Sequence, residues 1–178
     1  AAALTEMVAG LTIGKKKYAE VEEEMKAAIE PMHAICEHLL DDIKRDSESF
    51  DLYMQALTLP KETEEEKAAR QEAMQNGLKA AVAVPLSVAK RAYEIMPYAE
   101  VMVTKGNKTA VTDALVATMM ARTAVLGALF NVKINLESIK DEAFVAETTK
   151  EVEVLEKKAI EHEQKILAKA GVSKSVVE

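Results

Sequence analysis

Apolar residues recur at intervals of three and four over one long stretch of this 178-residue chain. Within residues 18–57 the repeating positions are Val21, Met25, Ala28, Met32, Ile35 and Leu39. This spacing is the period of an α-helix that buries one face. The chain has only six glycines and four prolines, and no run shows the clear alternation typical of a β-strand. The sequence therefore predicts an all-α fold.

The remaining helices follow from the same periodicity and from the turn residues between periodic segments. They are expected at about residues 1–11, 64–103 and 110–130, and from Ser138 to about Gly171. Thr63 with Glu66, and Ser138 with Asp141, have the spacing of a capping box at a helix start. Prolines at positions 31, 85 and 97 are expected to kink or split their helices.

Long helices with short connections predict an up-and-down antiparallel bundle of about five helices. We expect one domain over residues 1–178, with a frayed tail at 171–178. The helix at 110–130 is apolar on all sides and rich in alanine, so we expect it to be central. The last helix has its own stripe: Val145, Thr148, Val152, Leu155, Ala159, His162 and Ile166. This stripe resembles a coiled-coil seam, and we expect a homodimer that associates through helices.

Composition excludes several classes of function. A net charge of −7, 4% aromatic residues and no tryptophan argue against nucleic-acid or anionic-membrane partners. The single cysteine excludes an internal disulfide and a cysteine zinc cluster, and it fits a cytoplasmic protein. The three histidines have no metal-ligand spacing, so we expect no metal. The apolar run 114–130 contains Arg122 and is better explained as a core helix than as a membrane span.

The stripe of the second helix continues past Leu39 into acidic positions. Steps of three and four lead to Asp42 and Asp46, and Ile43 and Phe50 flank Asp46 on its own face. Burial disfavours the ionised form, so such a carboxyl should have a raised pKa unless a cation lies beside it. A carboxyl of this kind suits general acid–base catalysis. The alternatives are an ion pair across the bundle or a position that faces solvent.

Three further polar groups are candidates for ligand contacts. Asp113, in "KGNKTAVTD", lies where free N–H groups can hold an anion, although a helix-start carboxylate also satisfies the helix dipole. Asn131 and Asn135 are four residues apart and suit a neutral heterocycle, with capping of the helix end as the alternative. The only tight basic run consists of Lys15, Lys16 and Lys17. It can bind an anionic ligand or simply face solvent.

Four segments occur in a fixed order and resemble one protein family. They are "RDSESFDLYMQALTLPKETEEEKAAR", "LKAAVAVPLSVA", "KGNKTAVTDALVA" and "GALFNVKINLESIKDEAF". Together they resemble the cyclodeaminase/cyclohydrolase family. This family comprises the C-terminal domain of formiminotransferase-cyclodeaminase and stand-alone methenyltetrahydrofolate cyclohydrolases. The resemblance covers about residues 1–144.

The resemblance implies an all-helical, homodimeric folate enzyme without a metal or organic cofactor. Members convert 5-formiminotetrahydrofolate to 5,10-methenyltetrahydrofolate and ammonia, or open the methenyl bridge with water. The family's Asp-Ala-x-Ala-Phe motif matches "DSESF", which assigns the catalytic role to Asp46. The family's "GN…SD" and "NV-x-IN" elements match Gly106, Asn107, Thr112, Asp113, Asn131 and Asn135, with threonine in place of serine.

The same resemblance suggests how the substrate is held. The three consecutive lysines would pair with its glutamate carboxylates, and Asp113, Asn131 and Asn135 would hold the pterin. Family members usually carry a glycine-rich "PGGGS" segment before the alanines that open this chain, and the sequence begins without it. A cyclohydrolase is the first alternative, because both reactions pass through the same tetrahedral carbon. A non-catalytic helical dimer that acts as a scaffold is the second, and the missing glycine segment is its best support.

Overall fold

The computed structural model describes residues 1–171, and over this range it contains only helices and connecting turns. The α-helices are α1 (Ala2–Gly10), α2 (Glu22–Leu57), α3 (Glu64–Lys105), α4 (Val111–Leu136) and α5 (Glu142–Ala170), with two short 3-10 helices, η1 (Lys16–Val21) and η2 (Lys108–Ala110). The predicted all-α class is confirmed. Nearly all of the predicted frayed tail, residues 172–178, lies outside the described residues.

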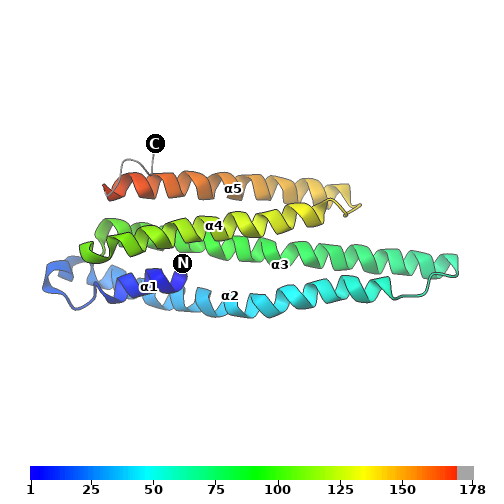
Figure 1. Cartoon of the computed structure of the whole chain (residues 1–178), viewed down its shortest axis with the longest axis horizontal. Coiled ribbons are helices and arrows are strands. Elements are labelled where there is room, and N and C mark those ends of the chain that lie inside the picture. Colours follow the sequence, from blue (N-terminus) through cyan, green and yellow to red (C-terminus); the bar gives the residue numbers. More distant parts are fainter. Residues whose placement is uncertain (172–178) are drawn as a thin grey trace.

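Helices α2 to α5 lie along the length of the molecule, and successive helices run in opposite directions (Figure 1). Helix α3 packs against each of the other α-helices. The short α1 packs against α2, α3 and α4 near one end of the bundle. The predicted up-and-down antiparallel bundle is confirmed, and α3 packs against more of the other helices than α4 does.

The prolines do not split their helices. Helix α2 runs through Pro31, and α3 runs through Pro85 and Pro97. Pro85 has no N–H group, so the carbonyl of Ala81, four residues earlier, lacks its helical partner. The side chain of Asn135 supplies one, because its Nδ2 donates to the Ala81 oxygen at 2.9 Å. This bond ties α4 to α3 where the proline interrupts the ladder.

Of the two predicted helix caps one is confirmed and one is wrong, and the end of α4 also differs from the prediction. The Thr63–Glu66 capping box is present at the start of α3. Helix α4 extends to Leu136, beyond the predicted end at residue 130, because it continues to bury apolar side chains such as Val132. Helix α5 is capped by Asp141, whose Oδ1 accepts from the Phe144 N–H at 3.1 Å. The prediction of a cap at Ser138 was therefore wrong.

The apolar stripe of α5 packs against other helices of the same chain. Thr148, Val152, Leu155, Ala159 and Ile166 are buried, and α5 packs against α3 and α4. The interpretation of this stripe as the seam for a second copy is therefore corrected.

Ion pairs add to the attachment of α5. The Glu163 carboxylate is buried and accepts from Arg122 Nε at 2.9 Å. His162 is a packed histidine, as expected, and its Nε2 lies 2.9 Å from Glu100 Oε2. Lys169 and His162 hold the pKa of Glu100 below its ordinary value, so this carboxylate is ionised at neutral pH.

Gly77 lets α3 approach the backbone of α2. A Cβ atom at this position would lie 2.8 Å from both Cα and N of Tyr53. We expect Gly77→Ala to lower the free energy of unfolding by roughly 1–2 kcal/mol, because the overpacking outweighs the better helix propensity of alanine. Urea denaturation measures this change.

Gly127 in α4 provides the matched control, since a Cβ atom there meets nothing within 4 Å. Gly127→Ala is expected to raise the free energy of unfolding by up to about 1 kcal/mol through helix propensity alone. If Gly77→Ala stabilises the protein as much as Gly127→Ala does, the close approach does not constrain the packing.

Helix α4 has a second property that bears on function. Residues Lys108–Leu136 are long and apolar enough, by length and composition alone, to cross a membrane. Core helices of helical bundles meet the same criterion, and here Ala114, Ala121 and Leu129 are fully buried against neighbouring helices. Other large apolar side chains of α4 remain exposed, namely Val116, Met119, Met120, Phe130 and Ile134.

Candidate functional site

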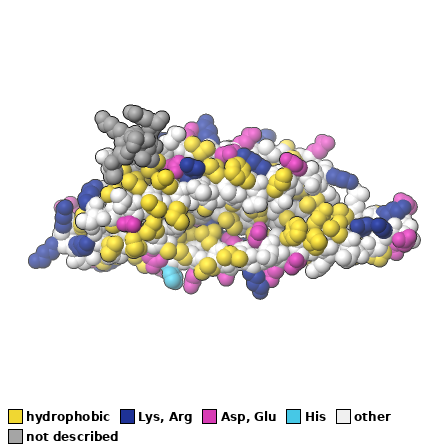
Figure 2. Space-filling model, in the orientation of Figure 1, with side chains coloured by type: hydrophobic (Ala, Val, Ile, Leu, Met, Phe, Trp, Pro, Cys, Tyr) yellow, Lys and Arg dark blue, Asp and Glu magenta, His cyan; other side chains and the backbone are white. Residues whose placement is uncertain are grey.

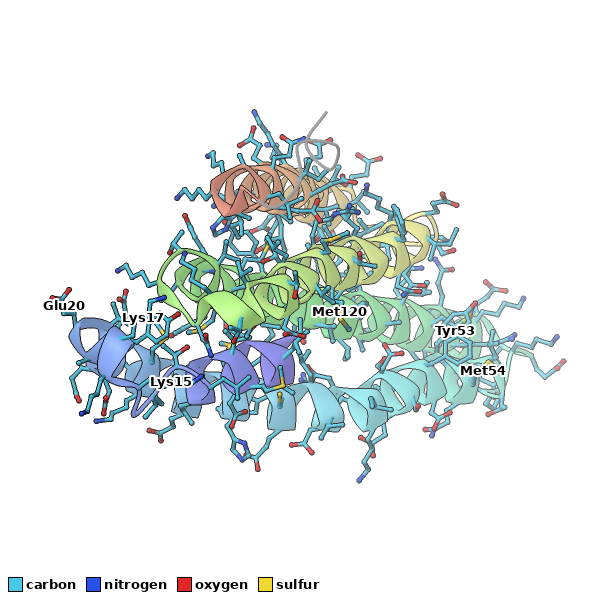
Figure 3. The ribbon with its side chains drawn as sticks, turned by 60° about the vertical axis from the view of Figure 1, so that its left-hand side comes forward. Lys15, Lys17, Glu20, Tyr53, Met54 and Met120 are labelled. Carbon is cyan, nitrogen blue, oxygen red and sulfur yellow. The ribbon has the colours of Figure 1, made fainter. Side chains whose placement is uncertain are left out.

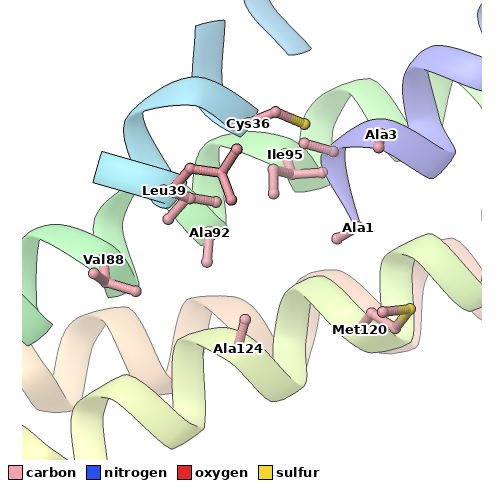
Figure 4. Close-up of a pocket in the computed structure, with 11 residues that line it drawn as sticks. Ala1, Ala3, Cys36, Leu39, Val88, Ala92, Ile95, Met120 and Ala124 are labelled. Carbon is pink, nitrogen blue, oxygen red and sulfur yellow. The ribbon is translucent and has the colours of Figure 1, made fainter. Parts of the chain in front are cut away.

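An apolar pocket of about 470 Å³ lies between the first four α-helices (Figure 4). Its lining is Ala1, Ala2, Ala3, Cys36, Leu39, Leu40, Val88, Ala92, Ile95, Met120 and Ala124. All of these side chains are apolar apart from the thiol of Cys36. Such a cavity suits the flat, largely apolar part of an organic ligand.

A second pocket, of about 370 Å³, adjoins the first and is more polar. The two share Leu39, Val88 and Ala124, so they are neighbouring parts of one groove. The second pocket adds Asp42, Ile43, Asp46, Pro85, Ala128 and Asn131. We call the two together the α2–α4 groove, because residues of α2 and α4 line its sides and residues of α3 lie between them.

Asp42 is the buried carboxylate that the stripe of α2 predicted. Only 2% of the residue is exposed, and its two oxygens accept from the guanidinium groups of Arg45 and Arg91. Arg45 lies one turn further along α2, whereas Arg91 comes from α3. The ion pair across the bundle, considered as an alternative for Asp46, is therefore found at Asp42. The trio carries a net positive charge beside the groove.

Asp46 lies one turn beyond Asp42 and lines the polar pocket, but it is exposed. Its backbone carbonyl accepts from the Ser49 hydroxyl at 2.7 Å. Its carboxylate forms no hydrogen bond or ion pair with any residue in 1–171. Of the interpretations considered for Asp46, the single chain agrees with a side chain that faces solvent rather than with a buried one. The carboxylate is instead available to a ligand in the groove.

The two asparagines predicted to bind substrate have different environments. Asn131 lines the polar pocket and is exposed, and within residues 1–171 its side chain forms only one hydrogen bond, a long one of 3.4 Å from Nδ2 to the Gly127 carbonyl. Asn135 does not line the pocket, because its amide nitrogen is bound to the Ala81 carbonyl of α3. The geometry therefore places Asn131 with Asp46, and gives Asn135 a role in joining two helices.

The remaining predicted residues lie at the other end of the bundle. Figure 3 shows Lys15 and Lys17 at the end opposite Tyr53 and Met54. From the start of α2 at Glu22 to Asp46 the helical rise amounts to roughly 36 Å. Within one chain, Asp46 is therefore too far from the three lysines, Lys15 to Lys17, to form one small-molecule site with them.

Asn107 is buried at this same end, and both its side-chain nitrogen and its side-chain oxygen are hydrogen-bonded. Its Nδ2 donates to the Leu11 carbonyl at 3.1 Å, and its Oδ1 accepts from the N–H and hydroxyl of Thr109 at 3.2 and 3.0 Å. The Tyr18 hydroxyl also donates to this oxygen at 3.4 Å. Asn107 thus joins the end of α1 to the turn before α4. Asp113 is half-buried in the first turn of α4, where the dipole favours a carboxylate.

Sequence reasoning missed the two arginines and the apolar half of the groove. The three-residue spacing of Asp42 and Arg45 was available as a signal for a local ion pair. Nothing in the sequence pairs Asp42 with Arg91, since they are joined only by the packing of α2 against α3. Within residues 1–171 no group of three or more His, Cys, Asp or Glu side chains is arranged to hold a metal ion.

Fold and site together define an elongated helical bundle whose groove presents one unpaired carboxylate and one amide beside an apolar cavity. A sequence model of the formiminotransferase-cyclodeaminase family matches residues 1–154. The chain belongs to this family. The predicted resemblance is confirmed.

Individual relatives carry two different names. A methenyltetrahydrofolate cyclohydrolase from Methylorubrum extorquens is 43% identical over 154 residues, which are 86% of this chain and 74% of that protein. A formimidoyltransferase-cyclodeaminase from Sus scrofa is 36% identical over 86% of this chain but only 28% of its own length. A crystal structure of formiminotetrahydrofolate cyclodeaminase from Thermotoga maritima has a TM-score of 0.78 and 32% identity, covering 94% of this chain and 81% of that one.

Proposed function

We propose that the chain is a folate one-carbon enzyme that converts 5-formiminotetrahydrofolate to 5,10-methenyltetrahydrofolate and ammonia. Family membership and the structural likeness to a formiminotetrahydrofolate cyclodeaminase support this proposal. The observation that carries it is Asp46, whose carboxylate lines the α2–α4 groove without a partner in residues 1–171. Asn131 lies on the same pocket and offers both a donor and an acceptor to a heterocycle.

The proposed reaction needs one proton to move between two nitrogens. The N10 amine attacks the carbon of the protonated formimino group and forms a tetrahedral centre bonded to N5, N10 and the amino group. The Asp46 carboxylate accepts the N10 proton and then, as the acid, donates it to the departing nitrogen. The bond from carbon to that nitrogen breaks, ammonia leaves, and the methenyl bridge remains. Since this step is proton transfer and nucleophilic addition, we propose no metal or organic cofactor.

The second candidate is methenyltetrahydrofolate cyclohydrolase activity. It is favoured by the relative from Methylorubrum extorquens, which is 43% identical and carries that name. Here Asp46 would take a proton from water as the oxygen adds to the methenyl carbon, and the bridge would then open. The same groove and the same carboxylate serve both reactions. A cytoplasmic location and the absence of nucleic-acid and membrane partners remain our expectation from the composition.

One assay separates these activities from a scaffold. The absorbance of methenyltetrahydrofolate is followed with the purified full-length protein, starting from 5-formiminotetrahydrofolate or from methenyltetrahydrofolate, in buffer with a chelator. A rise in absorbance with release of ammonia from the first compound identifies a cyclodeaminase. Decay of the second compound faster than in buffer identifies a cyclohydrolase. If a folded protein changes neither compound, it is the scaffold.

We also infer that two copies associate through the exposed apolar side chains of α2 and α4. These side chains include Leu40, Ile43, Phe50, Met120, Phe130 and Ile134. Figure 2 shows apolar side chains gathered on one face of the molecule, around its hollowed centre. Monomeric proteins rarely expose a continuous apolar patch of this kind, and association would also cover Asp46 and exclude water from the groove.

A charge placed in this face should separate the two copies. Light scattering is expected to give the wild type twice the 19.5 kDa of one chain. Ile134→Glu, at a residue that is 59% exposed on α4, should shift the mass to that of a single chain. Val154→Glu, at a residue 53% exposed on α5, is the control and should leave the mass unchanged. A wild type that is already a single chain contradicts this inference.

A further inference from the structure

A compact group of cations lies at the end of the bundle where α2 passes into α3. A pocket of about 320 Å³ there is lined by Lys61, Lys67, Arg70, Gln71, Met74, Gln75 and Lys140. Four of these seven side chains are basic and none is a carboxylate, although the whole chain has a net charge of −7. We call this group the basic pocket. Like charges at close range repel unless an anion offsets them, so the clustering points to an anionic ligand.

The cations of the basic pocket are largely unpaired. Lys61, Arg70 and Lys140 form no ion pair within residues 1–171. Lys67 pairs with Glu64 at 2.7 Å, but both groups are exposed and such a pair is weak. Two nearby carboxylates are occupied, because Glu66 completes the capping box of α3 and Asp141 pairs with Lys79 at 2.7 Å. Glu62, Glu65 and Glu72 are also close in sequence and form no ion pair within residues 1–171, but none of them lines the basic pocket.

Two hydrogen-bonded supports hold the walls of the basic pocket in place. Arg70 Nη2 donates to the Leu57 carbonyl at 3.0 Å, and its Nε–H is shielded from solvent without an acceptor in residues 1–171. On the opposite wall, Gln75 accepts from the Lys140 N–H at 2.8 Å and donates to the Ser138 carbonyl at 3.1 Å. The backbone that carries Lys140 is therefore fixed before any ligand arrives, which lowers the ordering cost of binding.

We propose that the basic pocket binds a ligand with two or more neighbouring carboxylate or phosphate groups. Arg70 and three lysines present donors from both sides of a 320 Å³ space, which matches several anionic groups better than one. The run from Lys15 to Lys17, by contrast, is exposed at the far end of the molecule.

The position of the basic pocket connects it to the α2–α4 groove. Gln71 and Met74 precede Pro85 and Val88 by fourteen residues on α3, close to four helical turns, so both pairs project from the same side. Along α2, the end of the helix at Leu57 lies roughly 17 Å from Asp46. Figure 2 shows basic side chains next to the apolar patch at this end of the visible face. If the groove holds a folate, the glutamate tail of that folate is the expected ligand of the basic pocket. This extension rests on the proposed function.

Direct binding tests the basic pocket without any turnover. Isothermal titration calorimetry measures the binding of γ-linked tetraglutamate and, separately, of pyrophosphate to the full-length protein. Lys61→Gln/Lys140→Gln is expected to weaken binding roughly tenfold, since each exposed charge pair contributes up to about a fivefold change. Lys158→Gln/Lys165→Gln makes the same charge change at exposed positions of α5 and should bind like the wild type. Affinity should also fall as salt rises from about 0.05 to 0.5 M.

The result for each ligand has a defined meaning. Binding of tetraglutamate alone identifies the acidic tail of a substrate as the ligand, and binding of pyrophosphate alone identifies a phosphate-bearing ligand. Either result upholds the anion site, even if the protein turns over neither folate. If the wild type binds neither compound, or the α5 control loses as much affinity as the pocket variant, the proposal is overturned.

Discussion

Replacing Asp46 by Asn is expected to lower kcat by about 100- to 10,000-fold. The amide keeps the size of the carboxylate but cannot accept the N10 proton or return it to the leaving nitrogen. Because Asp46 is exposed and has no partner within residues 1–171, the substitution removes no structural contact. The variant should therefore unfold at the same urea concentration as the wild type. Steady-state kinetics under saturating substrate measure the loss, with little expected change in KM.

Asp51→Asn is the matched control for this experiment. Asp51 is exposed on the same helix and lines neither part of the groove. Its replacement makes the same change of charge and should leave kcat within twofold of the wild type, by the usual scale of surface substitutions. A folded Asp46→Asn protein with full turnover would remove Asp46 from the mechanism and leave the groove without an acid–base group.

Replacing Asp42 by Ala is expected to lower the free energy of unfolding by about 3 kcal/mol. The substitution leaves the guanidinium groups of Arg45 and Arg91 facing each other without the carboxylate that both now bind. The loss of unfolding free energy should lie at the low end of the range for breaking a buried ion pair, because both arginines retain partial access to water. Urea denaturation followed by circular dichroism measures it.

The neighbouring carboxylate provides the comparison for Asp42. Asp41 is exposed and forms no ion pair in the described part of the chain. Asp41→Ala is therefore expected to change the free energy of unfolding by no more than about 0.5 kcal/mol. Equal effects at the two positions would mean that the buried trio adds nothing to stability beyond the charge of one surface aspartate.

The contrast between Asp42 and Asp46 shows how far periodicity can be used. The positions Ala28, Ile35, Asp42, Ser49 and Ala56, spaced by seven, are all buried. The companion series begins with Met25 and Met32, both buried, but Leu39 is half-buried and Asp46 is exposed. Helix α1 packs against α2 and ends at Gly10, so its cover is limited to part of α2. The stripe gives the direction of each side chain, whereas only the packing of other helices decides whether it is covered.

The same distinction explains the rest of the comparison. Helix content, the Thr63 cap and the antiparallel order depend on local sequence and short connections, and these predictions were confirmed. The site depends on which helices meet and how far apart their residues lie. Asn107 was grouped with the substrate-binding residues because its motif resembles that of the family. Its side chain instead closes a turn at the end of the bundle away from Asp46. Spacing along the chain gives distances within one helix, but not which residues of different helices meet across the bundle.

The bond between Asn135 and the Ala81 carbonyl joins the two helices that carry Pro85 and Asn131 of the groove. Pro85 is part of the groove wall, and the same residue deprives Ala81 of a helical partner. An amide from α4 takes that place, so a hydrogen bond joins α3 and α4 there in addition to their apolar packing. Asn131 lies one turn away on α4, on the face that lines the groove. Asn135 thus joins two helices, and Asn131 extends into the groove from the helix that this bond holds.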